Sequence, residues 1–149
     1  MPGPTSSNPE AGCADRERPF DDAWLSTVFL VPDPPRCWPG RFAIVTAHNP
    51  EGSPAGPKDN LAFESQLDDF LAAQGIASFE VTGASPDFRH EERGRGFVVR
   101  GIDEAAAIAT RFLQKGFFWV EDGDVYVAVD GSGQRWPLAR WSERLRIRP

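Results

Sequence analysis

The side chains of this chain that could carry chemistry are polar residues that follow predicted strands or open a predicted helix. They are Thr46, His48, Asn49, Asn60, His90, Glu91 and Glu92. An imidazole beside a carboxylate can transfer a proton near neutral pH. The free backbone N–H groups at a helix start can bind an anion. Together these residue types predict a polar site for a small anionic molecule.

Each candidate also has a purely structural explanation. Asn60 can cap its helix, Asn49 before a proline can form an Asx turn, and His90 beside acidic residues fits a solvated loop. No nucleophile is indicated, because Ser53 and Ser85 lack a G-x-S-x-G turn. The two histidines have no standard metal-ligand spacing. We therefore predict no metal and no cofactor, and whether the chain is an enzyme stays open.

A strand–helix–strand crossover must bring these residues together. Arg41–Ala47 is a nearly continuous apolar run and Ile76–Thr82 alternates, and both patterns are typical of strands. Strands joined by a helix are expected to be parallel neighbours, so their carboxyl ends share one sheet edge with the helix start. Ligands favour this edge in open α/β sheets. If the next strand, Phe97–Gly101, is antiparallel, its start also brings Arg93 and Arg95 there to neutralise an anion.

The two helices are predicted from apolar side chains spaced along one face. The first begins near Asp59–Asn60 and ends near Gly75, and the second begins at a cap residue, Asp103, and ends at Gly116. The buried face of the first comprises Phe63, Leu67, Phe70 and Leu71. The buried face of the second comprises Ala105, Ile108, Ala109, Phe112 and Leu113.

The remaining segments complete an α/β (α+β) pattern. Further strands are predicted at Trp24–Val31, Phe117–Glu121 and Val125–Asp130, with a hairpin turn at Asp122–Gly123 and a polar loop over Gly83–Gly96. The order β, β-α-β, β-α-β, β favours a two-layer sandwich in which a mixed sheet packs against two helices. The inner β-α-β-β-α-β unit matches ferredoxin-like folds, with an extra strand and a closing hairpin. A small doubly wound sheet is the alternative.

Composition limits the class of protein. The chain has 149 residues, 40% of them hydrophobic, and a net charge of -6 at pH 7, which argues against a whole-domain nucleic-acid binder. Residues 1–20 are rich in Pro and Ser and are expected to be disordered or loosely ordered, and residues 21–149 to form a single domain. No apolar run reaches the roughly 18 residues of a membrane span, no signal peptide is recognised, and Cys13 and Cys37 fit no zinc pattern. These features predict a soluble cytoplasmic protein.

The C-terminal segment offers a second kind of site. Residues 134–149 carry five arginines and one acidic residue, with Trp136 and Trp141 between the arginines. Arginines with aromatic rings are typical of a surface that stacks nucleic-acid bases, or that docks a partner or forms a homodimer. The alternative is that the tryptophans pack on the sheet while the arginines stay in water. The acidity of the rest of the chain favours this alternative.

One stretch carries a family resemblance. Phe42–Pro50 (FAIVTAHNP), Asn60 and the helix pattern through Phe112–Gln114 resemble a bacterial family of uncharacterised proteins, family 3293 of the domains of unknown function. Its members are similar to short α/β proteins in which a strand ends in a T-A-aromatic-N-P segment and an Asn opens the next helix; here His48 replaces the aromatic residue. The resemblance covers roughly residues 24–130 and implies no activity, cofactor or substrate. The positions it singles out are Thr46, Asn49 and Asn60.

Three classes of function fit these observations. The first is a small soluble module that binds an anionic small molecule at the edge where the strands end. The second is a hydrolase or transferase that uses His48 or His90 with a carboxylate. The third is an interaction protein that uses the Trp/Arg-rich C-terminal segment. The first fits the predicted site best, because no nucleophile or metal set supports the second.

Overall fold

The computed structural model describes residues 20–46, 57–129 and 134–147. Within these ranges eight strands form one sheet in the order β7-β6-β5-β2-β4-β3-β1-β8. The elements are η1 (Asp22–Ser26), β1 (Val28–Leu30), β2 (Arg41–Thr46), α2 (Pro57–Ala73), β3 (Ser78–Ala84), β4 (Glu91–Phe97), α3 (Ile102–Arg111), β5 (Gly116–Glu121), β6 (Asp124–Val129), β7 (Arg135–Arg140), α4 (Trp141–Arg144) and β8 (Leu145–Arg146). The predicted tail over residues 1–20 lies almost wholly outside the described residues.

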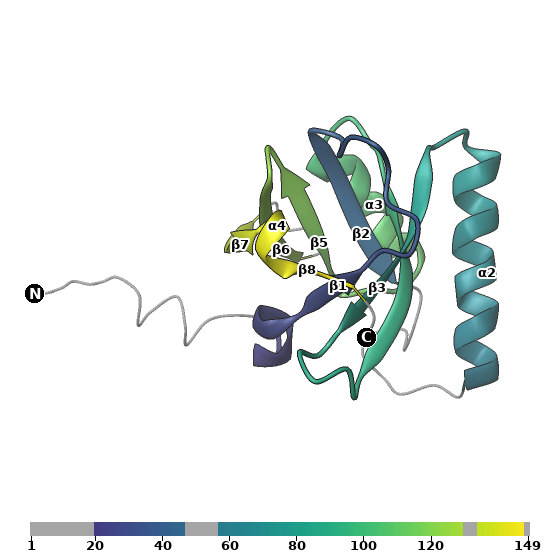
Figure 1. Ribbon diagram of the computed structural model, residues 1–149. Coiled ribbons are helices and arrows are strands. Elements are labelled where there is room, and N and C mark those ends of the chain that lie inside the picture. The colour runs from purple at the N-terminus through teal and green to yellow at the C-terminus, as the bar shows by residue number, and fades with distance from the viewer. Residues whose placement is uncertain (1–19, 47–56, 130–133, 148–149) are drawn as a thin grey trace, which may run out of the picture.

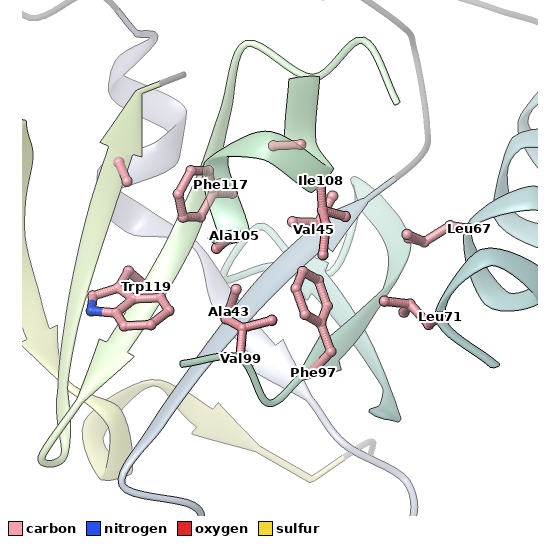
Figure 2. Packing of buried hydrophobic residues seen from close by; sticks show 12 residues of the cluster. Ala43, Val45, Leu67, Leu71, Phe97, Val99, Ala105, Ile108, Phe117 and Trp119 are labelled. Carbon is pink, nitrogen blue, oxygen red and sulfur yellow. The ribbon is translucent and has the colours of Figure 1, made fainter. Parts of the chain in front are cut away.

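The sheet curls, and its two faces are covered by different elements (Figure 1). Helices α2 and α3 pack on the outer face, where Val45 of β2 meets Leu67 of α2 and Ile108 of α3. Figure 2 shows this outer core, in which side chains of both helices point toward those of the strands. The short elements η1 and α4 lie on the inner face (Figure 1). The predicted two-layer arrangement of a mixed sheet against helices is therefore confirmed, with β1 and β8 as its parallel pair.

The middle of the sheet has the ferredoxin-like topology. The order β5-β2-β4-β3 is produced by two strand–helix–strand crossovers, through α2 and through α3, and every pair within it is antiparallel. Strands β2 and β3 do run in the same direction, as predicted, but β4 lies between them, so the prediction that they are neighbours is wrong. A doubly wound sheet would need adjacent parallel strands here and is excluded. The β5–β6 hairpin turns at Asp122 and Gly123, both with positive φ, as predicted.

Both helices begin earlier than their predicted caps. Helix α2 begins at Pro57, which places Asp59 and Asn60 in its first turn. Proline suits a first helical turn because the N–H it lacks would have no partner inside the helix. Helix α3 has Gly101 as its cap residue, so Asp103 lies in the first turn, where a carboxylate favours the positive end of the helix dipole.

The predicted buried faces are largely confirmed. Leu67 and Leu71 of α2 are fully buried, and α3 buries Ala105, Ile108 and Ala109. Leu113 is the exception: the helix ends at Arg111, and Leu113 has a positive φ of 59 and is 48% exposed. A side chain two residues past the end of a helix no longer follows its 3.6-residue period.

The largest correction concerns residues 83–101. The predicted loop over Gly83–Gly96 contains the end of β3 and nearly all of β4, whereas residues 98–101 of the predicted strand lie outside any strand. Strand β4 has the sequence EERGRGF, without the apolar alternation that identifies strands. Two of its outward positions, Arg93 and Arg95, form ion pairs with α2, and two of its inward positions are glycines. A Cβ on Gly94 would lie 2.5 Å from the carbonyl oxygen of Val45, and one on Gly96 would collide with the ring of Phe79.

Gly94→Ala is expected to lower the free energy of unfolding by about 2 kcal/mol, because the methyl group meets backbone that cannot move without breaking the sheet. Urea denaturation measures the loss. Gly40→Ala is the control, since nothing lies within 4 Å of a Cβ built on Gly40. Equal losses from the two variants would contradict the close approach of β4 to β2.

The C-terminal segment is part of the inner face. Helix α4 connects β7, at one edge of the sheet, to β8 at the other, and Trp141 is buried against Phe29 and Phe42 at ring distances of 5.1 and 5.2 Å. Trp136 packs on Phe20. The arginines of the segment that the structure describes make ion pairs or backbone hydrogen bonds; the Arg140 guanidinium lies 2.8 Å from Asp124. The tryptophans of the segment therefore pack within the fold, as in the alternative that the acidity of the rest of the chain favoured.

Candidate functional site

A pocket of about 240 Å³ lies on the inner face at the end of the sheet where β2 and β3 finish. We call it the edge pocket. Its walls come from the ends of β2 and β3, the turn between β3 and β4, the start of β5, and the η1 segment. In Figure 1 the β3–β4 turn and η1 both lie at the lower end of the molecule. This is the edge at which a ligand site was predicted.

The pocket is hollow because two inward strand positions in its wall are glycines. Gly83 of β3 and Gly116 of β5 both face inward. Two residues away on the same strands, the inward positions carry the large side chains of Val81 and Phe118. A Cβ on Gly83 would lie 3.5 Å from the Thr27 side chain, and one on Gly116 would lie 3.3 Å from the ring of Trp24. Without those side chains, the space beneath η1 stays open.

Polar groups gather at one end of the pocket. The Thr46 hydroxyl lies 3.3 Å from Oε1 of Glu92 and 3.4 Å from Oε1 of Gln114, and its one proton can be donated to either oxygen. His90 and Ser85 line the pocket from the turn between β3 and β4. A carboxylate residue, a histidine and two hydroxyl residues therefore lie at this end of the cavity, and the η1 segment adds two more hydroxyl residues to its lining.

Hydrogen bonds hold the turn that carries His90 and Ser85. The Ser85 hydroxyl donates to Oδ1 of Asp87 at 2.7 Å and accepts the backbone N–H of His90 at 3.1 Å, and the Ser85 N–H donates to the His90 carbonyl at 2.9 Å. The Ser85 hydroxyl, followed by the backbone N–H of Arg89, lowers the pKa of the Asp87 carboxyl. Because this pKa is lowered, the contribution of Asp87 to the turn is present above its ordinary pKa and is lost as the pH falls through the lowered value.

The structure brings together three of the seven predicted site residues. Thr46, His90 and Glu92 line the edge pocket. Glu91 belongs to the outer face, because successive side chains of a strand alternate and Glu92 faces inward. Asn60 lies on α2, which packs on the outer face. His48 and Asn49 lie outside the described residues.

The arginines expected to neutralise an anion face the other way. Nε of Arg93 lies 3.4 Å from Oε1 of Glu64, and Nε of Arg95 lies 3.6 Å from Oδ1 of Asp68, both on α2. These ion pairs place both guanidinium groups on the outer face of the sheet. The sequence prediction failed here because a polar loop has no defined faces, whereas a strand sends odd and even positions to opposite sides.

The η1 segment was not predicted as part of the site. Trp24, Ser26 and Thr27 line the pocket, although the sequence pattern indicated a strand over Trp24–Val31. The segment is held from the far end of the chain, since the Arg144 guanidinium donates to the Leu25 carbonyl at 2.9 Å and to the Thr27 carbonyl at 3.0 Å. No local sequence signal reveals a contact between residues so far apart.

A larger cavity, of about 660 Å³, lies between α2 and α3. This helix groove is lined mainly by Phe63, Phe70, Phe112 and Leu113, with the Arg111 guanidinium 4.6 Å from the centre of the Phe70 ring. The described lining of the groove contains no histidine and no hydroxyl residue, unlike that of the edge pocket. The edge pocket is therefore the stronger candidate for a specific site, although it is smaller.

In residues 20–46, 57–129 and 134–147, no three His, Cys, Asp or Glu side chains are grouped so that they could hold a metal ion. No helix in that part of the chain is both long and apolar enough to cross a membrane.

Comparison with known families confirms the resemblance seen in the sequence. Residues 45–116 match the model of a family described as protein of unknown function (DUF3293). We call this matched stretch the DUF3293 segment. The matched range is narrower than the predicted one and runs from the end of β2 to the first residue of β5. No curated protein and no solved structure matches the chain.

The DUF3293 segment contains Thr46, His90 and Glu92, and also Gly83 and Gly116. The polar end of the edge pocket and both glycines that leave it open therefore lie within the family region. The η1 segment and α4 lie outside that region, before and after it. The family description assigns no activity to the pocket.

Proposed function

We propose that the protein binds a small molecule in the edge pocket. The observation that carries this proposal is that Thr46, His90 and Glu92, from two strands and a turn, meet beneath Trp24 around one cavity. A cavity with an aromatic wall and a few convergent polar groups is the usual form of a small-molecule site. Its volume of about 240 Å³ is below the roughly 300–1,000 Å³ of drug-sized pockets. A ligand the size of a single ring with a short arm fits it best.

Binding is favoured over hydrolysis or group transfer. His90 and Glu92 share the pocket, which is the pairing that the enzyme alternative requires. The hydroxyl groups beside them are engaged with acceptor oxygens: Ser85 donates to Asp87, and Thr46 lies within reach of two acceptor oxygens. A nucleophilic hydroxyl would instead donate to the imidazole that activates it. The described lining thus supplies recognition groups without an activated nucleophile.

The interaction-protein alternative has no specific support. Trp141 is buried and Trp136 packs on Phe20, so the tryptophans of the C-terminal segment serve the fold. The cytoplasmic location and the homodimer stay predictions from the sequence.

Thermal unfolding with a panel of compounds tests the proposal. The panel combines nucleotides and phosphorylated metabolites with single-ring amines, alcohols and acids. A compound that binds only the native state raises the melting temperature by mass action. We expect at least one member to do so for the wild-type protein and not for Gly83→Val, whose side chain occupies the pocket. Gly40→Val is the control and keeps the response, because the space around Gly40 is open. A response that survives Gly83→Val places the ligand elsewhere and contradicts the proposal.

A further inference from the structure

We propose that the ligand of the edge pocket is a neutral molecule, an apolar ring whose short arm ends in a hydroxyl group that donates a hydrogen bond. This inference rests on the proposed function and names the ligand class of the same site. It takes the place of the anion expected from the sequence. Three features of the lining support it: the hydrogen bonds of its hydroxyl side chains, the ionisable side chains at its polar end, and its hydrocarbon wall.

The hydroxyl side chains in the wall already donate their protons to the protein. Ser26 and Thr27 both donate to the Ala23 carbonyl, at 3.2 and 3.1 Å. Ser85 donates to Oδ1 of Asp87 at 2.7 Å. A hydroxyl has one proton and two acceptor lone pairs, so a hydroxyl whose proton is in use can still accept a hydrogen bond. The group that complements such a lining is therefore a hydrogen-bond donor on the ligand.

Thr46 provides the acceptor at the polar end of the pocket. Its proton has two oxygens within reach, Oε1 of Glu92 at 3.3 Å and Oε1 of Gln114 at 3.4 Å. Whichever oxygen receives the proton, the Thr46 oxygen keeps a lone pair for a donor on the ligand. No direct contact between the ligand and the Glu92 carboxylate is needed.

The ionisable side chains at this end favour a donor without charge. Glu92 and His90 both line the pocket, and none of the described lining residues is lysine or arginine. The carboxylate opposes an anion, and the imidazole, which gains a proton as the pH falls below neutral, opposes a cation. A hydroxyl group donates a hydrogen bond and brings no charge near either side chain. It is therefore the donor that suits this lining best.

The rest of the wall is hydrocarbon. The rings of Trp24 and Phe118 lie 5.1 Å apart with an angle of 34° between their planes, and Ile44 contributes an aliphatic side chain to the lining. Trp24 approaches Gly116 with Cη2 and Cζ3, the edge of the indole that carries no N–H. Apolar surface of this kind is best covered by a hydrocarbon ring.

Calorimetric titration of the full chain with matched probes tests the inference. The first probe, 2-phenylethanol, carries the donor, and its methyl ether keeps the ring, the arm and the oxygen but has no proton to donate. We expect the alcohol to bind about fivefold more tightly than the ether, which is the effect of one hydrogen bond between neutral groups. Two charged probes, 2-phenylethylamine and 3-phenylpropanoate, are expected to bind more weakly than the alcohol, because a charge loses its hydration on entering an apolar pocket.

Two threonine variants assign the preference to one hydroxyl. Thr46→Val replaces the hydroxyl with a methyl group, so the alcohol and the ether are expected to bind equally, to within about twofold. Binding of the ether is expected to stay at its wild-type level, which shows that the pocket of the variant is intact. Thr110→Val is the matched control and keeps the fivefold preference, because Thr110 lies on α3, where its hydroxyl donates to the Ala106 carbonyl.

The outcomes separate the inference from the proposed function. An ether that binds as tightly as the alcohol, a preference that survives Thr46→Val, or a charged probe that binds most tightly overturns the inference. If Gly83→Val still abolishes binding of the probes in those cases, the edge pocket stands as the site. If none of the probes binds the wild-type protein, the inference is overturned, and the wider panel of compounds decides the proposed function by itself.

Discussion

Trp141→Ala is expected to lower the free energy of unfolding by about 4 kcal/mol, in the range measured for large aromatic residues removed from a core. Trp141 is 4% exposed, and its ring lies 5.1–5.2 Å from those of Phe29, Trp38 and Phe42. It also begins α4, which connects the two edge strands of the sheet. Removing the ring leaves a cavity at the point where the inner face closes. Urea denaturation measures the loss.

Two further variants show whether this loss comes from burial. Trp136→Ala is expected to cost about 1 kcal/mol, because Trp136 is only half-buried and little apolar surface is lost. Trp141→Phe is expected to cost far less than Trp141→Ala, since Nε1 of Trp141 is buried without a hydrogen-bond partner in the described structure and phenylalanine removes that donor. If Trp136→Ala and Trp141→Ala destabilise the protein equally, Trp141 does not close the inner face.

Ile108→Asp is expected to lower the free energy of unfolding by about 4 kcal/mol, because it puts an unpaired carboxylate among apolar side chains. Ile108 is 5% exposed and lies in the outer core with Val45 and Leu67 (Figure 2). The variant therefore tests whether α3 presents this face to the sheet. The loss is measured by the same denaturation.

Arg111→Asp on the same helix is the control for charge alone. Arg111 lies over the ring of Phe70 at 4.6 Å and does not belong to the buried face. Its replacement is expected to cost about 1 kcal/mol, the value of an exposed cation–π contact. Similar losses at positions 108 and 111 would mean that the buried face of α3 is wrongly assigned.

The elements with a clear hydrophobic period could be predicted from the sequence. The run Arg41–Ala47 corresponds to β2, the stripe through Ile108 to α3, and the turn at Asp122–Gly123 to the β5–β6 hairpin. Each of these signals is local, because burial of one face sets the spacing of apolar residues. The ferredoxin-like succession of elements was predicted from the sequence, but the strand order in the sheet was not, since β2 and β3 were expected to be neighbours and β4 lies between them.

Strand β4 could not be predicted, since its environment is set by the rest of the fold. Two of its inward residues, Gly94 and Gly96, are glycines because Phe79 and the backbone of β2 occupy the space beside them. Its outward arginines are balanced by acidic residues on α2. Neither feature produces the apolar alternation of an ordinary strand.

The sequence predicted at which edge of the sheet the candidate site lies, but it predicted only some of the residues that line it. The edge where β2 and β3 end does carry a pocket, and Thr46, His90 and Glu92 line it. Asn60 and Glu91 were misplaced because the side of the sheet that each faces depends on strand register and helix packing. Trp24 was missed because η1 reaches the pocket through contacts distant in sequence.

The central claim is that the edge pocket is a ligand site. A two-dimensional amide NMR titration with 2-phenylethanol tests it most directly, because it locates the bound molecule residue by residue. The largest chemical-shift changes are expected at the amides of Trp24, Thr46, Gly83 and Glu92. Changes that are largest at Phe70 and Phe112 would place the ligand in the helix groove and contradict the claim.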